Sequence, residues 1–93
     1  MKIYILSQIT GKDRESISKS HEKIEMEILS TGNEPVNPYK FITERMSNEE
    51  FFKVCLEKLI ECDSVYISKS SFRCSVCIKL NRVVKNIGIE KFK

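Results

Sequence analysis

The chain has 93 residues, of which 41% are hydrophobic and 31% charged, and its formal net charge is +3. This composition is typical of an ordinary globular protein, and one domain spanning residues 1–93 is expected. With so small a net charge, we expect no nucleic-acid partner.

The first half of the chain begins with a strand and then a helix. Lys2 to Ser7 is β-branched and aromatic and predicts a buried strand. Arg14 to Thr31 predicts a helix, because steps of four, three and four residues separate its inward-facing side chains: Ile17, His21, Ile24 and Ile28. Gly32 stands where a left-handed residue would end that helix.

A short strand and a second helix follow. The stretch EPVNP predicts a strand closed by Pro38, and Tyr39 to Met46 is expected to be a loop. Ser47 and Glu50 have the spacing of a capping box, in which the two side chains satisfy backbone donors at a helix start. The helix is expected to run to about Glu61, with Phe51, Cys55 and Leu59 facing inward.

The last third predicts a strand, a helix and a short final strand. SVYIS, from Ser64, is the strand, and the helix begins near Ser75 and ends at Gly88. Its expected inward-facing residues are Val76, Leu80, Val83, Val84 and Ile87. The stretch IEKF closes the series as a possible fourth strand. Strands that alternate with helices predict an α/β protein whose mainly parallel sheet has right-handed crossovers.

Ligands of such sheets bind outside the carboxyl ends of the strands. The loops at that edge are Ser7 to Lys12, Asn37 to Lys40, and Ser68 to Ser75. Helix starts in these loops suit an anion such as phosphate, and Gly11 would allow its close approach. The glycine patterns of phosphate-binding and dinucleotide-binding loops are absent, so we expect no cofactor. The basic last third is either a solvated helix face or an anion-attracting surface.

Three stretches resemble one protein family. MKIYILSQITG is similar to the opening of small phage and bacterial proteins related to nucleoside 2-deoxyribosyltransferases, which begin with a strand and Gly-Pro-Ile-Thr-Gly. STGNEPVNP resembles their Gly-x-x-Val-x-Asn-Pro stretch, and LIECDSVYI their Leu-x-x-Cys-Asp-x-x-Tyr segment. The order and spacing of the three stretches agree from Met1 to about Ile89.

The resemblance implies a flavodoxin-like three-layer sandwich of four or five strands, with a cleft for a nucleotide-like molecule. It also implies a catalytic aspartate, matched by Asp63, and a glutamate nucleophile on the third helix. Asn81 occupies the nucleophile position, and Cys77 and Ile78 replace a Gly-Ala pair. Gln8 replaces the proline of the first loop. An amide cannot attack an anomeric carbon, so the resemblance implies a member that has lost glycosyl transfer.

The functional prediction therefore has a first choice and alternatives. The first is a catalytically degenerate protein that binds a nucleotide-like or phosphorylated small molecule through Ser7, Gly11, Asn37 and Ser75. A non-enzymatic interaction module with a relic cleft is the main alternative. An N-glycosidase or deoxyribosyltransferase that uses another acid, and a thiol-dependent enzyme, stay open.

Four cysteines raise the question of a metal. Cys74 and Cys77 form a Cys-x-x-Cys pair, but Cys55 and Cys62 are seven residues apart and flank a helix. Structural zinc takes four ligands, usually as two close pairs, and His21 on an apolar stripe is expected to be a core histidine. We therefore expect no metal site.

The Cys-x-x-Cys pair has two other interpretations. Cys74 at a helix start would have a lowered thiol pKa and a redox partner one turn on. Alternatively, Cys77 packs beside Val84 as a small hydrophobic residue. The opening run MKIYILSQ is too short and lacks a cleavage site, so we expect no signal peptide, no membrane span and a cytoplasmic location. Thiols stay reduced there.

A homodimer is expected from the size of the chain and from two phenylalanines. A 93-residue domain built on a parallel sheet buries a modest core and leaves apolar surface exposed. Phe51 and Phe52 are adjacent, so one of them is expected to face a second subunit instead of the core.

Overall fold

Strands and helices alternate along the chain in the computed structural model, which describes residues 1–9, 13–43 and 45–92. The strands are β1 (Lys2–Leu6), β2 (Glu34–Val36), β3 (Ser64–Ile67) and β4 (Glu90–Lys91). The α-helices are α1 (Arg14–Ser30), α2 (Asn48–Ile60) and α3 (Ser75–Ile87). Two short 3₁₀ helices follow β2 and β3, namely η1 (Pro38–Phe41) and η2 (Lys69–Arg73).

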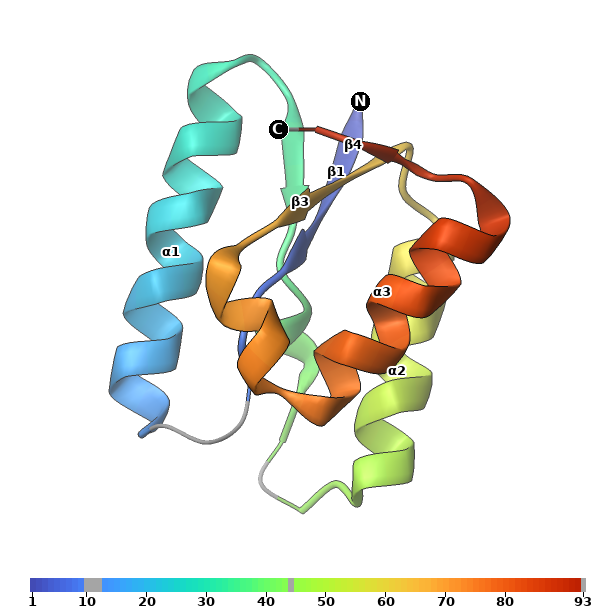
Figure 1. Ribbon diagram of the computed structural model, residues 1–93. Helices are drawn as coiled ribbons and strands as arrows, with labels where there is room; N and C mark the ends of the chain where they lie inside the picture. The colour runs from blue at the N-terminus through green and yellow to red at the C-terminus, as the bar shows by residue number, and fades with distance from the viewer. Residues whose placement is uncertain (10–12, 44, 93) are drawn as a thin grey trace.

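The strands form one parallel sheet in the order β2-β1-β3-β4. Figure 1 shows α1 alone on one side of this sheet and α2 and α3 together on the other. The expected α/β fold is confirmed, and the strand order is compatible with a flavodoxin-like sandwich. None of the helices in the described part of the chain is both long and apolar enough to span a membrane.

Each face of the sheet packs on its own hydrophobic cluster, because successive strand residues point to opposite faces. Ile3 and Ile5 of β1 face α1, where they pack with Ile24 and Ile28. The alternate residues of β1 face α2 and α3. That larger cluster holds Tyr4, Leu6, Val65, Cys55, Leu59, Cys74, Cys77, Leu80 and Val84. The core therefore lies mainly between the sheet and the helices α2 and α3.

The helix ends follow the predicted signals. The Ser47 hydroxyl accepts the Glu50 N–H at 3.2 Å and donates to the Glu50 carboxylate at 3.3 Å, so the hydroxyl half of the expected capping box forms where α2 begins at Asn48. Gly32 and Gly88 have φ of +80° and +76°, a region that favours glycine. These positions make α1 and α3 end where the sequence predicts.

Three details differ from the sequence-based expectations. Residues 38–41, expected mostly as loop, form η1, because Asn37 caps the Tyr39 N–H with its side chain. Ile87, expected to face inward, is 53% exposed. Phe51 and Phe52 both pack, partly buried, against the same core cluster, so the expectation that only one of them can face the core is wrong.

Candidate functional site

The loops after β1 and β3 meet through three hydroxyls, which we call the serine cluster (Ser7, Ser68 and Ser70). Ser68 Oγ donates to Ser7 Oγ at 2.9 Å, and Ser70 Oγ lies 3.1 Å from Ser7 Oγ and 2.9 Å from Ser68 Oγ. Ser70 Oγ also accepts the backbone N–H of Gln8 at 3.3 Å. The strand order reverses between β1 and β3, which is where parallel sheets bind ligands.

Ser7 is the buried member of the serine cluster, whereas Ser68 and Ser70 are partly buried. Ser7 is 2% exposed, and the Cys77 thiol donates to its backbone carbonyl at 3.0 Å. The Cys77 side chain, which replaces a glycine of the proteins that the sequence resembles, thus lies against the end of β1. A ligand at this edge therefore contacts the loops and the helix start around the cluster instead of Ser7 directly.

Asn37, the predicted ligand residue after β2, is 5% exposed and already engaged. Its Oδ1 accepts the Tyr39 N–H at 3.0 Å, and its Nδ2 donates to Glu25 Oε1 at 2.9 Å. The same Oδ1 lies 2.8 Å from Nδ1 of His21. Asn37 therefore organises the loop, and both its amide oxygen and its amide nitrogen are hydrogen-bonded within the protein.

His21 is fully buried and lies between the loops after β1 and β2. Its Nε2 is 3.2 Å from the Gln8 carbonyl, on the far side of the ring from Asn37. Burial lowers the pKa of His21 below its usual 6.5, and the contacts with Gln8 and Asn37 and the charge of Glu25 oppose that effect. The helical spacing predicted a core histidine at this position, and the structure confirms it.

The start of α3 opens onto a cavity that we call the α3 cavity. Cys74 is the N-cap residue, and its side chain makes no cap hydrogen bond to the first turn. Free N–H groups at a helix start attract anions. The cavity measures about 240 Å³ and lies between the starts of α2 and α3. Its lining residues are Asn48, Glu49, Phe52, Ser75, Val76 and Lys79.

The thiols have the surroundings of structural cysteines. Cys74 and Cys77 are each 1% exposed. A hydrogen bond with Cys74 that favours the protonated thiol, followed by burial, raises the pKa of Cys77 well above its usual range, so the thiol keeps its proton. Burial also raises the pKa of Cys55, and that of Cys62 to about 11. This geometry argues against the thiol-dependent enzyme.

No group of three or more potential metal ligands occurs within residues 1–9, 13–43 and 45–92. The four cysteines form no disulfide in that part of the chain.

Asp63, predicted as catalytic, lies at the other end of the sheet. It directly precedes β3, and its Oδ2 accepts the Lys2 backbone N–H at 2.9 Å. Because β3 has four residues, about 13 Å of strand separates Asp63 from the serine cluster. Asp63 and Ser7 therefore do not share a site. Gly11 lies outside the described residues.

Asn81 lies in the middle of α3, one helical turn beyond Cys77. Its Oδ1 is buried and has no hydrogen-bond partner in the described part of the chain. No carboxylate contacts the serine cluster among the hydrogen bonds of these residues. The expected nucleophile position thus faces the core side of α3 and holds an amide.

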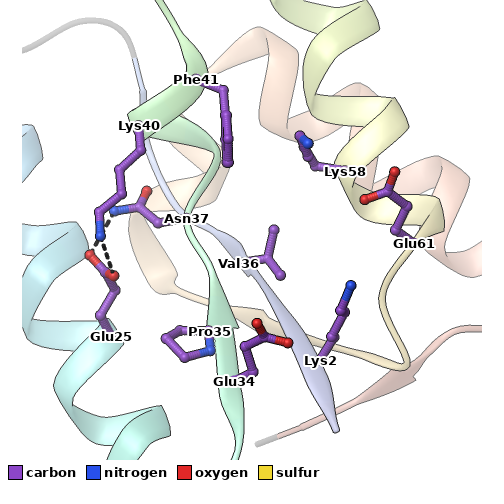
Figure 2. A pocket seen from close by; sticks show the side chains of 10 residues that line it. All are labelled: Lys2, Glu25, Glu34, Pro35, Val36, Asn37, Lys40, Phe41, Lys58 and Glu61. Atoms are coloured by element: carbon purple, nitrogen blue, oxygen red, sulfur yellow. Dashed lines mark hydrogen bonds and ion pairs between the residues drawn. The ribbon is translucent and has the colours of Figure 1, made fainter.

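A second hollow, the β2 groove, runs along the open edge of the sheet. Figure 2 shows its lining, with Asn37 and Lys40 both directed at Glu25 and with Lys2, Lys58 and Glu61 across the groove. Lys40 Nζ is 2.9 Å from Glu25 Oε2, and Lys58 Nζ lies 4.3 Å from the centre of the Phe41 ring. Sequence reasoning did not predict this groove.

Sequence reasoning found part of this edge. It placed Ser7, Asn37 and Ser75 at the carboxyl edge, and the structure brings them there, although Ser75 belongs to the α3 cavity. It missed Ser68 and Ser70 as partners of Ser7, and Lys79 beside Ser75. The run of serines directly after a predicted strand was the available signal.

A family model with the description "Domain of unknown function (DUF4406)" matches residues 1–88. No curated protein and no solved structure matches the chain. The description names no deoxyribosyltransferase, so the resemblance to that family stays a prediction.

Proposed function

The chain belongs to the family described as "Domain of unknown function (DUF4406)", and from its geometry we propose that it binds a phosphorylated, nucleotide-like small molecule without transferring a glycosyl group. The α3 cavity carries this proposal. An uncapped helix start, the Ser75 hydroxyl and the Lys79 ammonium converge there, and each favours a phosphate oxygen.

The other lining residues suit the rest of such a ligand. Glu49 offers a carboxylate that can accept hydrogen bonds from sugar hydroxyls, and Phe52 offers an aromatic ring beside it. At about 240 Å³ the cavity is smaller than the 300 Å³ or more of most ligand pockets. It therefore holds the phosphate and part of the sugar, and the base lies over the rim.

Relatedness to nucleoside 2-deoxyribosyltransferases is part of the proposal, and two observations support a lost activity. Asn81 cannot act as a carboxylate nucleophile. Asp63 lies at the opposite end of the sheet from the carboxyl edge. Asp63 therefore cannot replace the missing glutamate there, which weighs against a glycosidase that uses this acid.

Binding is tested by titrating the protein with deoxynucleoside 5'-monophosphates, deoxynucleosides and inorganic phosphate. Changes in the backbone amide chemical shifts report the binding. We expect the monophosphates to shift the amides of Ser75 and Val76. Lys79→Ala should weaken this binding by about 10- to 100-fold, the value of one charged hydrogen bond. The matched control is Lys85→Ala, an exposed lysine in the last turn of the same helix, which should leave affinity unchanged.

Three outcomes would contradict the proposal: no shifts with any monophosphate, equal binding of the nucleosides, or equal losses in the two lysine variants. Equal losses would indicate a diffuse electrostatic attraction.

Catalysis is tested separately by base exchange between deoxynucleosides. The parent protein should show none. Asn81→Glu restores the carboxylate, and base release by this variant alone would support the relation to the transferases. Rapid base release by the parent protein would refute the proposed loss of activity.

A non-enzymatic interaction module is a second proposal, favoured by the burial of Ser7 in the serine cluster and by an exposed apolar side chain near that cluster. Phe72 of η2 is 65% exposed. We propose a homodimer through this region, which sedimentation equilibrium at high micromolar concentration would detect. Phe72→Ser should weaken the dimer, and Met26→Ser on α1 should not. A monomeric parent protein would contradict this proposal.

A further inference from the structure

Both ring nitrogens of His21 face hydrogen-bond acceptors. Nδ1 lies 2.8 Å from Asn37 Oδ1, and Nε2 lies 3.2 Å from the Gln8 carbonyl oxygen. A neutral imidazole has one N–H, so it can donate to only one of these two oxygens. An imidazolium has two N–H groups and satisfies both.

The orientation of the Asn37 amide is fixed by its other contacts. Its Oδ1 accepts the Tyr39 N–H at 3.0 Å, and its Nδ2 donates to the Glu25 carboxylate at 2.9 Å. A reversed amide would lose both bonds and would place its oxygen against the carboxylate. A rotation of the Asn37 amide that would present its NH₂ group to His21 Nδ1 is therefore unfavourable.

We propose that His21 is a proton-dependent latch between the loops after β1 and β2. In the neutral state Nδ1–H donates to Asn37, the shorter contact, and the Gln8 carbonyl faces a bare nitrogen. In the protonated state Nε2–H donates to that carbonyl as well. The end of β1 is then tied to α1 and, through Asn37, to the loop after β2.

The protonated state has a counter-charge within the same network. Glu25 accepts from Asn37, which accepts from His21, and the side chain of Glu25 is only 14% exposed. Lys40 shares this carboxylate from the groove side, as Figure 2 shows.

The ring of Tyr39 lies near the ring of His21, with 5.5 Å between their centres. Arg14 in turn lies over the Tyr39 ring, with its Cζ 5.5 Å from the ring centre. Burial lowers the pKa of His21 by more than the contacts with Gln8 and Asn37 and the charge of Glu25 raise it. The latch therefore closes only at a pH below 6.5, the usual pKa of a histidine.

The latch acts on the backbone at the edge where we place the ligand. Gln8 follows Ser7 of the serine cluster, and its N–H is bonded to Ser70. When His21 is protonated, its Nε2–H bonds the Gln8 carbonyl, while Ser70 Oγ accepts the Gln8 backbone N–H. The backbone of Gln8 is then hydrogen-bonded on both sides. This inference concerns the protein alone and holds whether or not the α3 cavity binds a nucleotide.

The test is an NMR titration of ¹⁵N- and ¹³C-labelled protein from pH 8 to pH 4.5. Imidazole nitrogen shifts should show the neutral Nδ1–H form at pH 8 and both nitrogens protonated below a midpoint lower than 6.5. The Gln8 carbonyl shift should titrate with the same midpoint. An Nε2–H form at pH 8, a ring that stays neutral until the protein unfolds, or an unmoved Gln8 carbonyl would each overturn the latch.

Two variants move the midpoint in opposite directions. Asn37→Asp places a carboxylate against Nδ1 and should raise the midpoint by about 1 to 3 pH units. Glu25→Gln keeps an acceptor for Asn37 but removes the counter-charge, and should lower the midpoint. Glu22→Gln, at an exposed position of the same helix, is the matched control and should leave it in place. An unchanged midpoint in Glu25→Gln would contradict the proposed charge balance, even if Asn37→Asp failed to fold.

Discussion

At the carboxyl end of the sheet, Ser7 and Asn37 are buried and hydrogen-bonded, whereas at the amino end Lys2, Glu34 and Asp63 are exposed and charged. Exposed charges need no partner, because water solvates them. Buried polar groups must each find a hydrogen bond, and that requirement fixes the loops of the carboxyl end. The polar side chains with the most closely defined positions thus lie at the end of the sheet where parallel sheets bind ligands.

The largest expected effect concerns the thiols, which lie at both ends. Cys77 is near the carboxyl end, and Cys62 precedes Asp63 at the amino end. A rise in pKa from 9.0 to about 11 lowers the thiolate fraction of Cys62 by ~100-fold at neutral pH. Cys77 should react more slowly still, because its pKa is raised further and it is 1% exposed.

The measurement is alkylation at neutral pH with each site followed by peptide mass spectrometry, and the unfolded protein serves as the reference. Cys62 should be modified before Cys77. Fast modification of Cys77 would show that the carboxyl end opens readily, and the redox interpretation of Cys-x-x-Cys would then regain support.

The next effect is on stability at the carboxyl end. Ser7→Ala removes the hydroxyl that joins Ser68 and Ser70, and leaves these two with fewer partners in a partly buried place. A lost buried hydrogen bond of this kind reduces the free energy of unfolding by about 1–3 kcal/mol. Urea denaturation measures it. Ser20→Ala, on the exposed side of α1, is the control, and equal losses in the two variants would contradict the role of the serine cluster.

A smaller effect depends on pH. The pKa of His21 is lower in the folded protein than in the unfolded chain, where it is near 6.5, so the unfolded state binds the proton more readily. The free energy of unfolding should therefore fall as the pH drops from about 6.5 to the folded pKa, by at most about 1.4 kcal/mol per pH unit for one proton. Above about pH 7.5 this contribution is flat.

Denaturation at pH 7.5, 6.5 and 5.5 tests the sign, because ordinary carboxylates titrate lower. The His21→Gln variant should lose this pH dependence. A parent protein that becomes more stable on acidification would show that the imidazolium is favoured in the fold.

The sequence predicted the elements well because their signals are local. Gly88 and the Ser47–Glu50 pair mark helix ends within four residues, and the spacing around His21 marks a buried stripe. The serine cluster could not be predicted from local patterns, because Ser7 and Ser68 are 61 residues apart in the sequence and come together only when β1 and β3 pair. Strand register and loop contacts of that kind follow from the packed sheet and not from local periodicity.

The position of Asp63 in the sheet could have been predicted from the sequence. The residue precedes the strand predicted from Ser64, and in a parallel sheet such a position lies at the amino end. The family resemblance pointed to Asp63 by its residue type. The direction of the strand that follows it already placed Asp63 away from the carboxyl end of the sheet. A residue is therefore a stronger site candidate when both its motif and the direction of its strand place it at the carboxyl end than when the motif alone does.

The smallest expected effect is at Asp63 itself. Asp63→Asn keeps an oxygen for the Lys2 N–H and removes only the charge, at an exposed position where water screens it. The free energy of unfolding should change by less than about 0.5 kcal/mol, and binding of a deoxynucleoside monophosphate should stay within twofold of the parent. Lys79→Ala provides the contrast in the same titration. A large loss of binding in Asp63→Asn would mean that the amino end holds the ligand, and the assignment of the two ends of the sheet would be reversed.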